Sequence, residues 1–178
     1  MKFDLDKTLE IIERTPSVLN ALLQGVSDDW VHHNEGENTW SVFDVVGHLI
    51  VCEQTDFITR TKIILSSSGD KILVPIDRQA QFAWSKGKTL ADLLKAFEVH
   101  RKENIQKLLA FQLGDSDFEK AAVHPKLGNL TLRDLLATWA VHDLNHLSQI
   151  TRVMAKQYKE AVGPFTVFLG ILNLKHTA

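Results

Sequence analysis

Two histidines stand four residues apart in the stretch TWAVHDLNHLSQI, residues 138–150. Apolar residues around them recur at the three- and four-residue spacing of an amphipathic helix, and His142 and His146 fall on that apolar track. Both rings are therefore expected to face the core, one helical turn apart. This is the His-x-x-x-His arrangement with which helices bind zinc, so the pair is a candidate for metal binding.

A third inward histidine, His48, shares an apolar stripe with Val45, Leu49 and Cys52. A buried ring nitrogen without a partner costs a few kcal/mol, and leucine and valine offer no acceptor. One divalent cation would satisfy all the inward rings. The competing interpretation is that each histidine is a core residue with an ordinary hydrogen bond. Cys52, one turn after His48, is either a fourth ligand or a small buried hydrophobe.

Three histidine ligands would leave a divalent ion at least one open position, which is typical of a catalytic site because structural zinc usually fills all four. The ion would lower the pKa of a bound water toward neutrality or deprotonate a bound thiol. Hydrolysis and thiol transfer are therefore both open. A third class is a non-catalytic bundle whose metal or histidine cluster only fixes the core, or which binds a ligand without transforming it.

Four further residues are candidates for a pocket around this cluster. Asp143 stands where His-Glu-x-x-His metalloproteases carry a general base, but it is one methylene shorter and suits hydrogen bonding better. Asp56 lies two turns beyond His48 and is either a base or solvated. Arg101 would meet an anionic substrate or pair with a neighbouring acid. His124, in the loop before the last long helix, lines a pocket mouth or is simply exposed, as we expect of His32, His33 and His176.

The segments that must position these residues all have helical periodicity, and no stretch shows the sustained alternation of a sheet. We expect long helices at 5–26, 41–65, 89–112 and 132–158 and a short extra C-terminal helix at 165–174. Their predicted N-caps are Asp4, Ser41 with Asp44 in a capping box, Thr89 and Thr131. Pro16 kinks or restarts the first helix. The fold class is therefore all-α, a four-helix bundle in which the helices cover one another's apolar stripes.

The connections are long enough to cross such a bundle, so loop length does not fix its topology. Residues 66–88 contain Ser, Gly and Pro and one helical turn near 78–84, and connections of this length are often functional. Residues 27–39 and 113–129 are expected to be loops. The C-terminal apolar segment either closes the core or forms a dimer seam.

Length and composition limit the function classes. We expect one domain over residues 1–178. With 20 basic and 22 acidic residues and a formal charge of -2, no basic face for nucleic acid is indicated. A single cysteine excludes an intrachain disulfide and fits a reducing, cytoplasmic setting. We expect no signal peptide and no membrane partner, because the longest apolar run, 165–174, is about half a bilayer span.

Three stretches together resemble the DinB-like bundle proteins, a family grouped with bacillithiol and mycothiol S-transferases and also described as metal-dependent hydrolases. They are RTPSVLNALLQGVSDDW (14–30), TWSVFDVVGHLIVCE (39–53) and the block from 123 to 165 that contains the histidine pair. The resemblance covers nearly the whole chain. Each piece alone would be weak, but the combination of spacings is specific.

The resemblance implies an up-down-down-up bundle that holds zinc or nickel on His48, His142 and His146. It also implies a small-molecule substrate, a low-molecular-weight thiol as co-substrate, and a homodimer. On this ground we favour thiol-dependent S-transfer to a small electrophile. Hydrolysis by metal-bound water and a non-catalytic metal- or ligand-binding bundle remain the alternatives.

Overall fold

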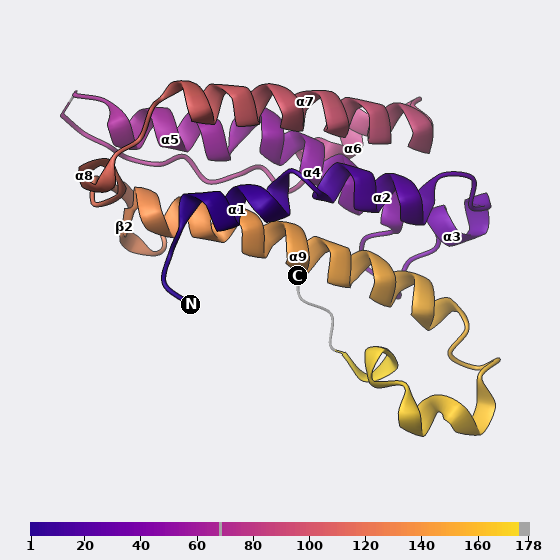
Figure 1. Cartoon of the computed structure of the whole chain (residues 1–178). Coiled ribbons are helices and arrows are strands. Elements are labelled where there is room, and N and C mark those ends of the chain that lie inside the picture. Colours follow the sequence, from indigo (N-terminus) through magenta and orange to yellow (C-terminus); the bar gives the residue numbers. More distant parts are fainter. Residues whose placement is uncertain (68, 175–178) are drawn as a thin grey trace.

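A computed structural model gives the structure of residues 1–67 and 69–174, in which four long helical segments pack side by side (Figure 1). The segments are α1 (Leu5–Ile12) with α2 (Thr15–Leu23), α4 (Val42–Thr55) with α5 (Phe57–Leu65), α7 (Leu90–Ala110), and α9 (Leu132–Gln157). Shorter elements join them: α3 (Asp28–His32), α6 (Ala80–Ser85), α8 (Asp115–Phe118), β1 (Ala121–His124), β2 (Gly128–Thr131), η1 (Gly163–Phe168) and η2 (Gly170–Asn173). The predicted all-α four-helix bundle is confirmed.

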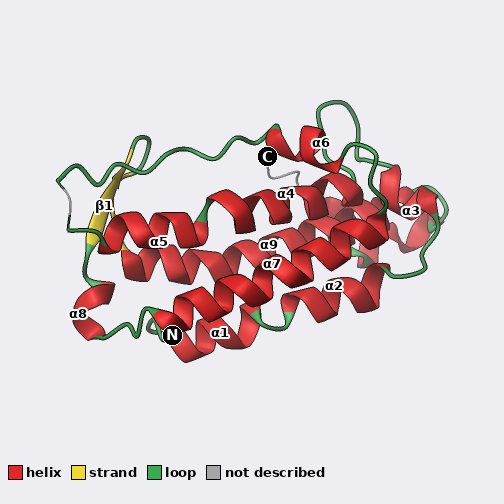
Figure 2. Ribbon diagram, turned by 90° about the horizontal axis from the view of Figure 1, so that it is seen from above, coloured by secondary structure: helices red, strands yellow, loops and turns green. Residues whose placement is uncertain are grey.

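The order of the segments is up-down-down-up. The chain after α5 returns along the outside of the bundle to α6 before α7 begins (Figure 2). For this reason α4–α5 and α7 run in the same direction, while α1–α2 and α9 run opposite to them (Figure 1). The described part of this long connection, 66–67 and 69–88, therefore runs along the bundle, and its helix α6 packs against α4.

Capping boxes fix where the second, third and fourth segments begin. The Ser41 hydroxyl accepts the backbone N–H of Asp44, and the Asp44 carboxylate accepts the backbone N–H of Ser41. Thr89 with Asp92 and Thr131 with Asp134 repeat this reciprocal arrangement. Such caps each contribute about 1 kcal/mol. The predicted starts of these three segments are confirmed.

Two of the long segments are interrupted. The first restarts at Thr15 and Pro16, which was one of the two outcomes predicted for that proline. The prediction of one uninterrupted helix to Leu65 is wrong, because the backbone of Asp56 leaves helical geometry at φ −107° and ψ −93°. No glycine or proline marks this break. The Asp56 carboxylate instead pairs with Arg60 in the first turn of α5.

The loop predicted at 113–129 contains structure that the sequence did not reveal. After α8, β1 and β2 form an antiparallel hairpin in which His124 is paired with Gly128. Gly128 has a φ of +76°, in the left-handed region that glycine adopts without strain. The backbone of Val123 also bonds to Lys71 and Leu73 in the connection between α5 and α6. The hairpin thus ties that connection to the start of α9.

The C-terminal segment differs from the predicted helix at 165–174. It forms two 3₁₀-helices, η1 and η2, drawn in yellow after the end of α9 (Figure 1), and η2 contacts α9. Leu172 is buried, whereas Phe165, Val167 and Phe168 are exposed. The segment therefore closes little of the core. His176 lies outside the described residues.

The core has two hydrophobic clusters, and the three inward histidines lie between them along α4 and α9. One cluster contains Phe57 and Trp139, whose rings stack 4.8 Å apart at an angle of 3°. The other contains Leu49 and Ile150. Among residues 1–67 and 69–174, no helix combines the length and the apolarity needed to cross a membrane.

Candidate metal centre

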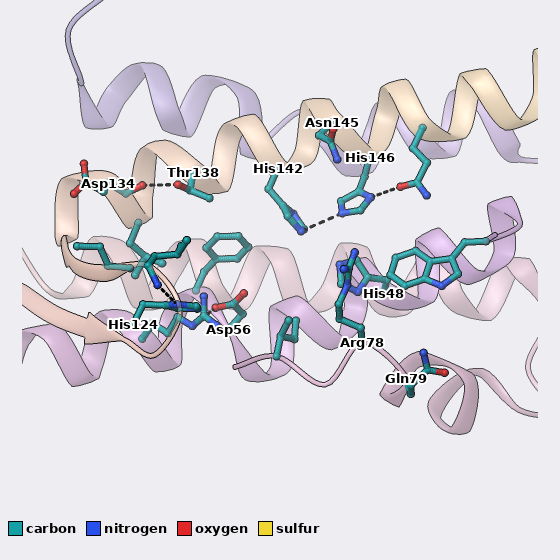
Figure 3. Close-up of a pocket in the computed structure, with 18 of the residues that line it drawn as sticks. His48, Asp56, Arg78, Gln79, His124, Asp134, Thr138, His142, Asn145 and His146 are labelled. Carbon is teal, nitrogen blue, oxygen red and sulfur yellow. Dashed lines mark hydrogen bonds and ion pairs between the residues drawn. The ribbon is translucent and has the colours of Figure 1, made fainter. Parts of the chain in front are cut away.

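The three predicted histidines meet inside the bundle. His48 comes from α4, and His142 and His146 come from successive turns of α9 (Figure 3). One nitrogen of each ring lies within 4.8 Å of the nitrogens of the other two. The Nε2 atoms of His142 and His146 are 3.1 Å apart. Among the described residues, this is the set of histidine, cysteine and acidic side chains that is close enough to share a cation.

Neighbouring side chains hold each ring in place. His146 Nδ1 lies 2.8 Å from Gln149 Oε1, to which it donates its proton, so that Nε2 keeps its lone pair. The ring of His48 packs against Trp40 at a centroid distance of 4.8 Å. The ring of His142 meets the edge of Phe57 at 5.4 Å.

Burial keeps the three rings neutral. Desolvation lowers the pKa of His48 to about 3 and that of His142 to about 2, and the neighbouring His146 adds repulsion to both. Desolvation also lowers the pKa of His146, although its hydrogen bond to Gln149 opposes the change. Neutral imidazoles present lone pairs, which is the form that binds metals.

The arrangement fits a divalent cation. Two imidazole nitrogens bound to one tetrahedral zinc at about 2.05 Å lie about 3.3 Å apart, close to the separation within the α9 pair. Nδ1 of His48 and Nδ1 of His142 are both buried without a hydrogen-bond partner among the described residues. A cation shared by neutral nitrogen donors would compensate for part of that desolvation. Imidazole donors suit zinc, copper, iron and nickel, so the donor set alone does not select one of these metals.

A cavity of about 580 Å³ opens directly onto the three histidines (Figure 3). This volume is within the usual range of small-molecule sites. One wall is α9, and the opposite wall combines α4, the start of α5, the connection between α5 and α6, and the β hairpin. Its other polar lining residues are Asn38, Asp56, Arg60, Arg78, Gln79, His124, Asp134, Thr138, Asn145 and Gln149. Its apolar lining residues are Trp40, Phe57, Ile76, Leu127, Leu130 and Leu135.

Of the further pocket candidates, Asp56 and His124 line this cavity. Burial raises the pKa of Asp56 to about 6, even though Arg60 Nε lies 2.6 Å from its Oδ1. His124 Nδ1 accepts the backbone N–H groups of Lys126 and Leu127, so its neutral ring carries the proton on Nε2.

Cys52 touches the histidines without lining the cavity. Its Sγ lies 3.4 Å from Nε2 of His48 and 3.8 Å from Nε2 of His142. Burial raises the pKa of the thiol, with the nearby Asp56 and other acids adding to the effect. The cysteine is outside the set of mutually close donors. It packs as a small buried side chain with the cluster of Phe57 and Trp139.

Arg101 and Asp143 lie outside this cavity, in a buried network. Arg101 is 1% exposed and donates to the carboxylates of Glu53 and Asp143 and to the carbonyl of Ile12. The Thr15 hydroxyl donates to Asp143 at 2.6 Å. Of the two fates considered for Arg101, pairing with neighbouring acids is the one observed. Asp143 likewise serves hydrogen bonding within the core.

Sequence reasoning missed several residues beside the triad, among them Gln149, which hydrogen-bonds to His146. Trp40 directly precedes the capping residue Ser41, and it lines the cavity. Arg78 carried no periodic signal because it lies in the connection before α6. The unusual length of that connection was the available indication. His32 and His33 are exposed, as expected.

Comparison with known proteins gives an independent view of the chain. The protein of Bacillus subtilis (strain 168) named "Putative metal-dependent hydrolase YfiT" is 25% identical over 152 residues, which cover 83% of each chain. The solved structure of YfiT, described as a four-helix bundle of unusual topology, has a TM-score of 0.68 at 21% identity and covers 86% of both chains. TT2238, described as a four-helix bundle protein, has a TM-score of 0.56 at 18% identity, over 83% of this chain and 98% of its own.

The two structures show that the fold is shared. The family model of the DinB superfamily matches residues 11–150, a range that contains all three inward histidines. Because this match covers most of the chain, the protein belongs to the DinB superfamily.

Proposed function

We propose that the protein is a divalent-metal-dependent enzyme acting on a small molecule. His48, His142 and His146 hold the ion, and the substrate enters the adjoining cavity. The observation that carries this proposal is the convergence of neutral imidazoles from two helices on a cavity of about 580 Å³. Three protein ligands would leave a divalent ion at least one coordination position for a substrate, as catalytic sites require. The name of YfiT, a relative within this superfamily, agrees with metal dependence.

Thiol transfer is the chemistry that we favour. A divalent ion, when bound, lowers the pKa of a thiol or water that it coordinates and so supplies a nucleophile at neutral pH. Hydrolysis usually also needs a general base near the nucleophile. Both carboxylates that line the cavity are already engaged, Asp56 by Arg60 and Asp134 by the cap at Thr131. A thiol drawn from a reducing cytoplasm would need no such base once it is ionised.

Hydrolysis is the second candidate, and one observation favours it besides the name of YfiT. Asp56 lines the cavity and its pKa is raised to about 6, which suits a general base working near neutral pH. The residue lies eight positions after His48, about 12 Å along a helix. A substrate of several atoms would have to bridge that distance.

Metal content tests the shared part of both candidates. We would express wild type, His142→Ala and His33→Ala in medium supplemented with zinc and nickel, purify them mildly, and measure bound metal by elemental analysis. Wild type and the exposed control His33→Ala should each carry about one ion per chain, and His142→Ala should lose most of it. A wild-type protein without stoichiometric metal would end the proposal.

A cobalt-substituted sample separates the two chemistries. A thiol that binds cobalt as a thiolate produces a sulfur-to-metal charge-transfer band in the near ultraviolet. We expect N-acetylcysteine to produce this band in wild type and not in His142→Ala. If the band is absent and the zinc protein cleaves a simple ester at a rate that Asp56→Asn reduces, hydrolysis is the function and thiol transfer is wrong.

We also propose that the protein is a homodimer. Phe165, Val167 and Phe168 of η1 are at least two-thirds exposed, which is unusual for adjacent apolar side chains of a monomer. Sedimentation velocity at micromolar concentration tests this point, and a monomer at all concentrations would contradict it.

A further inference from the structure

Arg78 lines the cavity and is exposed, and among the described residues it has no acidic partner. It lies in the connection before α6 and points toward the cavity beside His48 (Figure 3). Its guanidinium carbon is 5.6 Å from the ring centroid of Trp40, and that ring is 4.8 Å from the ring of His48. Across residues 1–67 and 69–174, no carboxylate forms an ion pair with Arg78.

The other charges in the cavity all have partners. Arg60 contacts Asp56 at 2.6 Å and donates to the carbonyl of Val74. Asp134 accepts the backbone N–H of Thr131 at 2.8 Å. The two arginines and two aspartates of the lining cancel formally, so a divalent ion would give the cavity a charge of about +2. Such a cavity attracts an anion.

We propose that Arg78 forms an anion subsite that binds a carboxylate or phosphoryl group of the substrate. This inference rests on the proposed function, because it places the reacting end of the same molecule at the histidines. The planar guanidinium donates two parallel hydrogen bonds to such an oxyanion. Trp40 supports the plane of the guanidinium and is also packed against His48. The substrate class is therefore a small molecule with an oxyanion a few bonds away from its reacting atom.

A purely structural role would give a different result. If Arg78 only stacked on Trp40, its replacement would change no anion's affinity. A lysine at this position keeps the charge but loses the two-pronged hydrogen bond. Arg78→Lys and Arg78→Gln therefore separate the contributions of charge and geometry. Arg78 is exposed, so neither change should disturb folding, which circular dichroism would verify.

Calorimetric titrations with defined probes test the subsite. We would use succinate, phenyl phosphate and the uncharged succinamide, on zinc-loaded and metal-free protein. Lys86→Gln is the matched control, because Lys86 is an exposed cation at the end of α6 that does not line the cavity. We expect Arg78→Gln to weaken the binding of succinate or phenyl phosphate at least tenfold. Arg78→Lys should give an intermediate loss of affinity, and Lys86→Gln should leave the affinity unchanged. The preferred anion identifies a carboxylate or a phosphoryl group.

The outcomes distinguish this inference from the proposed function. Equal anion affinity in wild type and Arg78→Gln, or no binding of either anion at millimolar concentration, would overturn the subsite even if the histidines hold metal. If the wild-type protein bound no zinc even when zinc was supplied, but still bound an anion in a way that depended on Arg78, the subsite would be supported and the metal enzyme rejected. Binding of succinamide as tight as that of succinate would also overturn the subsite.

Discussion

Replacing Arg101 by methionine should destabilise the protein more than almost any other single substitution. The arginine makes five hydrogen bonds, to Glu53, Asp143 and the carbonyl of Ile12, at distances of 2.5–2.9 Å. The side chains of both acids have no solvent exposure. Arg101→Met would therefore leave two carboxylates buried without their counter-charge, although Thr15, Asn104 and Trp139 would still donate to them.

Removal of one partner from a buried ion pair typically costs about 3–5 kcal/mol. Two acids depend on Arg101, so we expect the upper part of that range, a large fraction of a total stability that is typically about 5–15 kcal/mol. Urea denaturation followed by tryptophan fluorescence would measure the loss. The control is Arg133→Met, which breaks an exposed pair with Glu119 and should cost below about 1 kcal/mol.

If unpaired buried charge causes the loss of stability in Arg101→Met, removing the charge should reverse it. Combining Arg101→Met with Glu53→Gln and Asp143→Asn removes the charges and should restore most of the stability. Low pH should also narrow the gap between Arg101→Met and wild type, because unpaired buried carboxyls have raised pKa values and the native state gains when they are protonated. If Arg101→Met cost below about 1 kcal/mol, or the triple variant were as unstable as the single one, the reasoning would be refuted.

Two further substitutions test local features. Burial raises the pKa of Asp56 in the folded protein to about 6, whereas its pKa in the unfolded chain is about 3.9. The free energy of unfolding is therefore highest below about pH 3.9, where this carboxyl is protonated in both states, and it falls as the pH rises through about 6. The difference between the two pKa values corresponds to about 3 kcal/mol, and Asp56→Asn should gain up to this amount relative to wild type between pH 4 and pH 7 in urea titrations; an unchanged difference would contradict the burial argument. At Gly47 an added Cβ would lie 2.5 Å from Ser85 Oγ, so Gly47→Ala alone should not stabilise α4. In the Ser85→Ala background the same change should raise stability by about 1 kcal/mol, as measured by thermal unfolding. The absence of any gain there would show that the close approach to Ser85 is not the cause.

Helix positions were predictable because their signals are local. Ser41, Thr89 and Thr131 each precede an aspartate by three residues, and every one of these capping boxes is present. The apolar spacing of α9 likewise predicted that His142 and His146 would face inward. The break at Asp56 was not predictable, because a side-chain pairing with Arg60 in a cavity wall leaves no mark in helical periodicity.

The cavity itself depends on non-local contacts. The hairpin that carries His124 is held by pairing with the connection that carries Arg78, and neither segment has periodicity to reveal this. Arg101 shows the same limit in the core. Its position suggested either a substrate or an acid as partner, and only packing of the helices shows that Glu53 and Asp143 flank it.

The buried network and the histidines are coupled through shared helices. Glu53 follows His48 by five residues on α4, and Asp143 is adjacent to His142 on α9. Because Arg101 of α7 bonds to both acids, it links α4 to α9 and restricts the position of one helix along the axis of the other. That axial position determines how far the ring of His48 lies from the histidine pair on α9. A shift of α4 by one residue would move the His48 ring by about 1.5 Å. The proposed metal site, with bonds of about 2 Å, could not tolerate such a shift, so we expect the ion pairs of the core to support its geometry.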